Sequence, residues 1–143
     1  MRYAEDMPQE LSTAYPYKGV SGTCGFEASQ GKVKVSSIAS VPASSIDQLK
    51  AAIAKGPVSV TVEADNSVFQ SYTSGVLDSK ACGTNLDHAI TAVGYGTENG
   101  LDYYLVRNSW GPAWGDNGYI KIAAVEGEGI CGIQQTSVYP TIV

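Results

Sequence analysis

The sequence has little of what most catalytic and metal-binding sites use. Its 143 residues contain one histidine, His88, and three cysteines, Cys24, Cys82 and Cys131. No two cysteines have C-x-x-C spacing and there is no second histidine, so the residues predict no metal site. An imidazole general base, if the chain has one, must be His88.

Charge and long apolar runs are also scarce. The chain has 9 basic and 14 acidic residues, a net charge of −5. Without a basic cluster we expect no nucleic-acid partner, and without an apolar run of about 18 residues no membrane partner. The start of the sequence lacks the apolar segment of a signal peptide, so any targeting sequence is expected to lie outside it. The segment Gly94–Gly100 has neither dinucleotide-binding nor Walker spacing, and no cofactor is predicted.

The residues that are present favour a folded domain with many loops. Apolar residues make up 43% of the chain and glycines number 16, a balance that excludes a disordered chain and a coiled coil. A chain of this length accommodates one ordinary domain, so residues 1–143 are expected to form a single one.

The clearest local pattern predicts a helix followed by a strand. Ser45 and Gln48 have capping-box spacing, and apolar residues at helical spacing continue up to Gly56-Pro57. We therefore expect a helix of about nine residues that begins after Ser45. Val58–Val62 alternates apolar and polar residues as a half-buried strand does.

Strands dominate the rest of the prediction. Residues 1–43 are expected to be extended, with one short strand at Lys32–Val35. Asn66 is expected to cap one helical turn that carries Phe69 and Tyr72. Further strands separated by Gly-rich turns are predicted at Ala89–Tyr95, Tyr103–Arg107 and Gly118–Ile122. The fold class is therefore α+β, a mainly antiparallel, twisted sheet with one or two short helices.

A loop after one of these strands carries residues that can complete a site around the histidine. Asn108 and Trp110 lie there among glycines. An asparagine oxygen can accept the imidazole N–H, and an indole above that pair would exclude water. Asp87 precedes His88, but neighbouring side chains of a strand point to opposite faces, so Asp87 is not expected to orient the imidazole. A structural histidine and an ordinary core loop are the alternatives at this point.

Five strings in the second part of the sequence are informative through their order. They are Leu86-Asp87-His88-Ala89, Ala92-Val93-Gly94-Tyr95-Gly96, Tyr104-Leu105-Val106-Arg107-Asn108-Ser109-Trp110-Gly111, Trp114-Gly115-Asp116-Asn117-Gly118-Tyr119-Ile120 and Cys131-Gly132-Ile133. In order and spacing these strings resemble the C-terminal half of papain-like cysteine peptidases of the cathepsin L type. The likeness covers residues 3 to 141.

The resemblance implies a role for each candidate residue. His88 would be the general base and the partner of a thiolate, Asn108 would orient its imidazole, and Trp110 would shield their hydrogen bond. Ser109 would be a bystander. Such enzymes attack the carbonyl of a peptide or protein substrate with a cysteine thiolate, protonate the leaving amine from the imidazolium, and hydrolyse the resulting thioester.

The resemblance also implies a fold, disulfides, a compartment and a substrate pocket. The fold would be the right-hand, barrel-like lobe of a papain-like enzyme. Cys82 and Cys131 would form a disulfide, and Cys24 would pair with a cysteine outside this sequence. Such bridges imply a lysosome or vacuole, or secretion. The substrate pocket, whose uncharged members would favour apolar side chains, would be lined by Thr61, Leu86, Asp87, Ala89 and Thr136.

One departure from the family pattern limits what the chain is expected to do alone. The sequence has no Cys-Gly-Ser-Cys-Trp motif with a Gln before it, which supply the nucleophile and an oxyanion donor in this family. Cys24 matches a structural-disulfide position instead. Residues 1–143 are therefore expected to be a C-terminal lobe, inactive until the cysteine-bearing N-terminal lobe or chain is supplied.

Two other functions remain open from the sequence. A truncated homologue without activity would act as a binding module, or would pair with a second copy through the face that normally meets the missing lobe. Ser109 as a serine nucleophile beside His88 lacks a nucleophile-elbow motif and an acidic partner. A disulfide from Cys24 to a cysteine-bearing chain would favour the peptidase, whereas a homodimer would favour the binding module.

Overall fold

The computed structural model describes residues 2–142, and the chain divides into two compact units. One unit contains the residues up to Ala39 together with those from Pro140 onward, and the other is Ser40–Tyr139. The larger unit, Ser40–Tyr139, holds most of the buried core and all of the candidate catalytic side chains.

The smaller unit is mostly irregular chain, as its many turn-forming residues predict. It contains a helix, α1 (Arg2–Asp6), a short 3-10 helix, η1 (Ala28–Gln30), and the start of strand β1 (Val35–Ser40). The predicted strand at Lys32–Val35 is displaced along the chain, because Val33 forms only an isolated bridge with Gln9 and regular pairing begins at Val35.

The predicted helix in the larger unit is confirmed as α2 (Ile46–Ile53). The side chain of Ser45 accepts a hydrogen bond from the backbone N–H of Gln48, which satisfies one of the free donors at the helix start. The helix ends before Gly56-Pro57, and its buried residues Leu49, Ala52 and Ile53 pack into the core.

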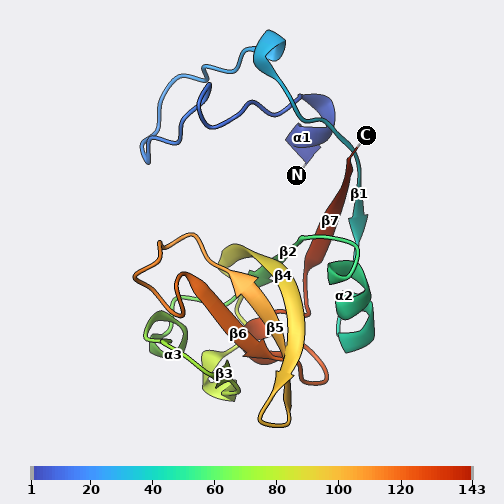
Figure 1. The fold of residues 1–143 in the computed structure, drawn as a ribbon, viewed down its shortest axis with the longest axis vertical. Coiled ribbons are helices and arrows are strands. Elements are labelled where there is room, and N and C mark those ends of the chain that lie inside the picture. Colours follow the sequence, from blue (N-terminus) through green and yellow to red (C-terminus); the bar gives the residue numbers. More distant parts are fainter. Residues whose placement is uncertain (1, 143) are drawn as a thin grey trace. The chain divides into compact units, whose positions relative to one another are not determined.

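Seven strands form one sheet within the described residues (Figure 1). Besides β1 they are β2 (Val58–Val62), β3 (Val76–Leu77), β4 (His88–Glu98), β5 (Leu101–Arg107), β6 (Tyr119–Ala123) and β7 (Ser137–Ile142). The order is β1-β7-β2-β4-β5-β6-β3, and the β2–β7, β2–β4, β4–β5 and β5–β6 pairs are antiparallel, whereas β3 pairs parallel to β6. The predicted mainly antiparallel fold is confirmed, and the sheet is open rather than closed into a barrel.

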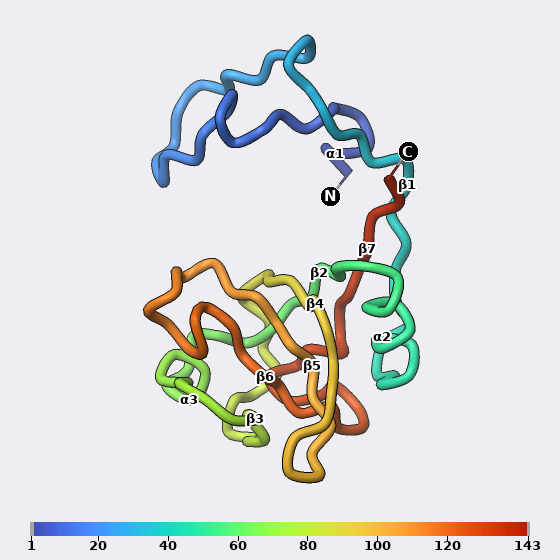
Figure 2. Tube along the Cα trace, in the orientation of Figure 1, coloured from blue at the N-terminus to red at the C-terminus, as the bar shows by residue number. Residues whose placement is uncertain are grey.

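Short helical turns connect these strands along the chain traced in Figure 2. They are α3 (Ser67–Gln70), η2 (Lys80–Cys82) and η3 (Ile130–Gly132). The side-chain oxygen of Asn66 caps α3 by accepting the N–H of Phe69, as the sequence predicts. Among residues 2–142, no helix has the length and apolar character needed to cross a membrane.

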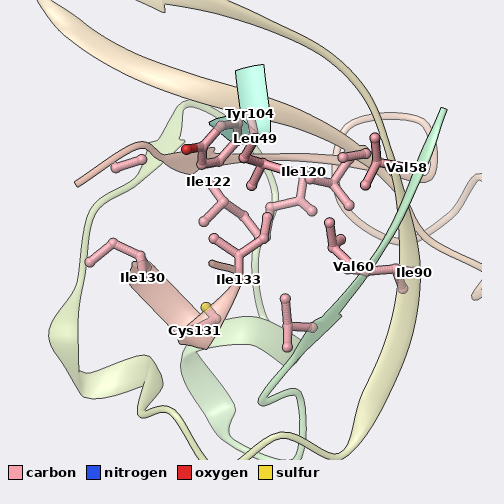
Figure 3. Close-up of a cluster of buried hydrophobic side chains, with 14 of the residues drawn as sticks. Leu49, Val58, Val60, Ile90, Tyr104, Ile120, Ile122, Ile130, Cys131 and Ile133 are labelled. Carbon is pink, nitrogen blue, oxygen red and sulfur yellow. The ribbon is translucent and has the colours of Figure 1, made fainter. Parts of the chain in front are cut away.

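The core of the larger unit lies where β2, β4, β5 and β6 meet the side chains of α2 and η3 (Figure 3). Val58, Val60 and Val62 are fully buried, so the alternation seen in the sequence of β2 is the burial pattern of the strand. Each such valine contributes about 1.5–3 kcal/mol by leaving water. This packed sheet is the support for β4, whose first residue is His88.

Candidate active site

His88 is positioned by the pairing of β4 with β2, where it lies opposite Val62. Asp87, the residue before His88, fixes the start of β4. The N–H of Asp87 donates to the carbonyl of Val62 over 3.0 Å, and its carboxylate accepts from the N–H groups of Ala64 at 2.8 Å and Asp65 at 3.1 Å. The Asp87 carboxylate therefore binds backbone N–H groups, and, as expected, it does not orient the imidazole.

Asn108 reaches the histidine from the residue that follows β5. Its backbone N–H donates to the carbonyl of Gly118, and its side chain is 7% exposed. The Nε2 atom of His88 lies 2.9 Å from the Oδ1 atom of Asn108, which is hydrogen-bond distance. Two side chains that are 20 residues apart in the sequence are thus brought together by the β4–β5 hairpin.

A backbone donor decides which end of the Asn108 amide faces the histidine. The N–H of Ser109 donates to Asn108 Oδ1 over 2.7 Å, and because a backbone N–H can only donate, the atom that it meets must be oxygen. The same oxygen faces His88, so Nε2 must carry a proton and Nδ1 is left as the free nitrogen of a neutral ring.

The orientation of Asn108 has an energetic cost. Its Nδ2 atom is buried and finds no hydrogen-bond partner among residues 2–142. A buried donor without a partner costs about 1–3 kcal/mol. The Oδ1 atom of the same amide, by contrast, has two partners, the N–H of Ser109 and Nε2 of His88.

Trp110 covers the histidine. The two rings are stacked, with centroids 5.1 Å apart and planes 28° from parallel. Trp110 is itself 40% exposed, and its ring lies against one face of the imidazole.

The indole of Trp110 rests on further aromatic rings. The buried ring of Phe69 meets Trp110 edge-on at 5.6 Å and stacks on Trp114 at 5.1 Å. The Nε1–H of Trp114 donates to the carbonyl of Gln70 over 3.0 Å. Sequence analysis predicted the helical turn that carries Phe69 but not its link to the histidine. We call the group formed by Phe69, Tyr72, Trp110 and Trp114 the aromatic cluster.

Three of the five expected pocket residues, Thr61, Ala89 and Thr136, are neighbours on the backbone. Thr61 pairs with Ala89 across β2 and β4, and the N–H of Thr61 donates to the carbonyl of Thr136 over 3.2 Å. Leu86 is half-buried two residues before His88. Only the side chain of the fifth, Asp87, is committed elsewhere, to the two backbone N–H groups described above.

The cysteines occupy two kinds of environment. Cys82 and Cys131 are buried and form a disulfide with a Cα–Cα distance of 4.9 Å. The carbonyl of Cys131 accepts the N–H of Glu63, the residue after β2, so the bridge lies near the end of β2 that pairs with His88 of β4. Cys24 is exposed, belongs to the smaller unit and has no disulfide partner among the described residues.

Comparison with known proteins identifies the family. Residues 2–141 match the model of the family described as papain family cysteine protease. The chain belongs to the papain family. It is 49% identical over 129 residues to cysteine proteinase RD21A of Arabidopsis thaliana, and 41% identical over 143 residues to chymopapain of Carica papaya. These alignments cover 88% and 98% of this chain.

Solved structures of papain-family proteins have the same fold. The bromelain protease from Ananas comosus, in complex with the E64 inhibitor, superimposes with a TM-score of 0.90 at 38% identity, covering 99% of this chain and 67% of that one. Digestive procathepsin L 3 of Tenebrio molitor gives 0.91 at 33% identity, covering 98% of this chain and 46% of that one. The predicted lobe of a papain-like fold is confirmed.

The alignment with these papain-family relatives covers only part of the length of each relative. The chain spans 28% of RD21A and 40% of chymopapain. It is the C-terminal part of the papain-family domain, and the 143 residues contain no Cys-Gly-Ser-Cys-Trp motif. The site assembled here thus has an imidazole, an amide and an indole, but the sequence supplies no cysteine of the family's nucleophile motif.

Proposed function

We propose that this chain supplies the base of a papain-family cysteine endopeptidase, with the nucleophile provided by residues outside this sequence. The observation that carries the proposal is the contact between His88 Nε2 and Asn108 Oδ1, made by an amide whose orientation is fixed by the N–H of Ser109. The family match over residues 2–141 supports the same chemistry.

In the proposed reaction, His88 Nδ1 takes the proton of a cysteine thiol, and Asn108 and Trp110 keep the imidazolium in place. The thiolate attacks the carbonyl carbon of a peptide bond, and the imidazolium gives its proton to the leaving amine as the C–N bond breaks. Water then attacks the thioester, His88 takes a proton from that water, and the same proton returns to the cysteine sulfur as the acid leaves.

Ser109 does not enter this mechanism through its side chain. It lies beside Asn108, but only its backbone N–H contacts that residue, and its hydroxyl makes no hydrogen bond to His88 among the described residues. This arrangement supports a cysteine-based reaction over the serine alternative.

The proposed partner is the cysteine-bearing N-terminal part of a papain-family domain. The exposed thiol of Cys24 is available for the disulfide that the family pattern implies. The buried bridge between Cys82 and Cys131 supports an oxidising location, which we propose to be a lysosome, a vacuole or the extracellular space. Substrates with apolar side chains are proposed because Thr61, Leu86, Ala89 and Thr136 carry no charge.

The test is reconstitution. The pure chain is expected not to hydrolyse a fluorogenic peptide, and mixing it with the cysteine-bearing half of a papain-family enzyme should produce hydrolysis. His88→Ala should lower this activity by about 10⁴-fold, because the base is lost. Asn108→Ala should lower it by about 100-fold, because a misplaced base still transfers protons slowly. Hydrolysis by the chain alone that His88→Ala abolishes would contradict the need for the second half.

The binding-module alternative predicts a different species. It is favoured by one observation, the exposed thiol of Cys24, which could join two copies of the chain. Mass measurement without reductant separates the two functions. A mixed disulfide between Cys24 and the cysteine-bearing half, together with restored hydrolysis, supports the peptidase. A homodimer that does not exchange with that half and shows no hydrolysis supports the binding module.

A further inference from the structure

Asn66 connects the buried disulfide to the aromatic cluster. Its Nδ2 atom donates to the carbonyl of Cys82 over 2.7 Å and lies 3.7 Å from the sulfur of the same residue. Its Oδ1 atom accepts the N–H of Phe69 over 3.0 Å. One side chain thus joins η2, which is tied down by the Cys82–Cys131 bridge, to α3, which carries Phe69.

The helix that Asn66 holds is too short to be stable by itself. The four residues of α3 form a single turn, and an isolated turn is unfavourable because few hydrogen bonds offset the ordering of its backbone. Its position must therefore come from its cap and from its neighbours. Asn66 provides the cap and, through Nδ2, a fixed point outside the helix.

Two kinds of contact between α3 and the indoles, ring packing and a hydrogen bond, depend on where α3 lies. The ring of Phe69 supports Trp110 edge-on and Trp114 face-on. The carbonyl of Gln70 accepts the indole N–H of Trp114. A displacement of α3 would therefore move Phe69, which supports Trp110, the ring stacked on His88, and which also meets His88 itself edge-on with centroids 6.4 Å apart.

We infer that Asn66 is a positioning residue for the catalytic pair: by joining η2 to α3, it sets how closely Trp110 covers His88. The inference rests on the proposed function for the role of His88, but the placement of Trp110 can be measured without catalysis. It adds to the site a residue that touches neither His88 nor Asn108 and that acts through Phe69.

The experiment uses His88 as a probe, because it is the only histidine in the sequence. An indole stacked on an imidazole shifts the ring protons of that imidazole upfield in the NMR spectrum. Trp110→Ala gives the position of these resonances for an uncovered ring, and the unaltered chain gives it for a covered one. Asn66→Ala is expected to lose about half or more of this displacement, since a stacked pair depends closely on ring geometry. The ring of Phe69 also meets His88 edge-on at 6.4 Å, so the same substitution is repeated in a Trp110→Ala chain, where it should move the resonances far less.

A second variant separates the bridge from the cap. Asn66→Asp keeps an oxygen that can accept the N–H of Phe69 but loses the N–H donor to the carbonyl of Cys82. We expect the His88 resonances to move in this variant too. If Asn66→Ala does not fold, Asn66→Asp decides the question alone.

Ser45→Ala is the matched control. It removes the same kind of N-cap from α2, whose cap contacts Gln48 and no member of the aromatic cluster. The His88 resonances should be unchanged in this variant. The proposal is overturned if Asn66→Asp leaves these resonances where they are in the unaltered chain, or if Ser45→Ala displaces them as far as Asn66→Ala does. Neither result would affect the reconstitution test of the proposed function.

Discussion

Asn108 shows most directly how one side chain controls the state of another. Its Oδ1 atom accepts hydrogen bonds from the backbone N–H of Ser109 and from Nε2 of His88, while its own Nδ2 atom is buried without a partner among the described residues. The contact with the Oδ1 atom therefore defines which nitrogen of the His88 ring faces Asn108.

The first prediction concerns the tautomer of His88. In the unaltered chain, at a pH where the imidazole is neutral, the proton should be on Nε2, because Asn108 presents only an acceptor. Asn108→Ala removes that acceptor and should give a mixture of the two tautomers. The nitrogen chemical shifts of His88 report the ratio. Ser109→Ala retains the backbone N–H and should leave the ratio unchanged; a mixture in the unaltered chain would contradict the assignment.

At the scale of single residues, the sequence predicted that His88 and Asn108 would be in contact, but it did not predict the geometry of that contact. The order and spacing of the strings around His88 and Asn108 were enough to pair these two residues. The fixing of the amide by the N–H of Ser109 depends on a loop conformation, and the position of Phe69 under Trp110 depends on contacts between segments about 40 residues apart. Neither is encoded in a local pattern.

Two acidic residues, Asp65 and Asp87, lie close together where β2 ends and β4 begins. Asp87 places its carboxylate on the N–H groups of Ala64 and Asp65, and the charge of Asp87 raises the pKa of the neighbouring Asp65, with a further contribution from burial. The folded state therefore binds a proton at Asp65 more readily than the unfolded chain does.

The second prediction follows from that pKa. The repulsion between Asp65 and Asp87 is fully present above the raised pKa of Asp65 and is relieved as the pH falls through it. Asp65→Asn should therefore stabilise the chain at neutral pH, and the gain should shrink as the pH falls through the raised pKa. Urea unfolding at a series of pH values measures this. Asp78→Asn, which makes the same change in charge on an exposed residue, should give no comparable trend.

The third prediction concerns the disulfide between Cys82 and Cys131. The bridge closes a sequence separation of 49 residues, and the loss of chain entropy in the unfolded state corresponds to about 4 kcal/mol. The double variant Cys82→Ala with Cys131→Ala should lose stability of this order in denaturant unfolding under oxidising conditions. Cys24→Ser should change it little, because Cys24 is exposed. Equal losses in both variants would contradict the assigned pairing.

The elements with strong periodicity were predictable, and the others were not. The capping box of α2 and the alternation of β2 lie within a few residues of chain, so sequence patterns contain them. The strand β3 has two residues and shows no period, and β7 contains Pro140, which argues against a strand. These two strands exist because neighbouring strands offer them hydrogen-bonding partners.

The whole chain combines an extensive packed core with part of the proposed catalytic site. The larger unit buries an extensive cluster of apolar side chains, so it has the support that a site needs. The same unit holds the imidazole, the amide and the indole, whereas the sequence lacks the nucleophile motif of the papain family. The family could be predicted from ordered strings because their spacing is set by the sheet that they build.

The most direct measurement of the central claim is the reactivity of the added cysteine. At mildly acidic pH a free thiol, whose pKa is about 8.5, is protonated and reacts slowly with iodoacetamide. Adding this chain to the cysteine-bearing half should accelerate alkylation of that cysteine, because His88 takes its proton. The account predicts that His88→Ala removes the acceleration while leaving the association of the two halves intact. Equal acceleration by the unaltered chain and by His88→Ala would show that His88 does not act as the base.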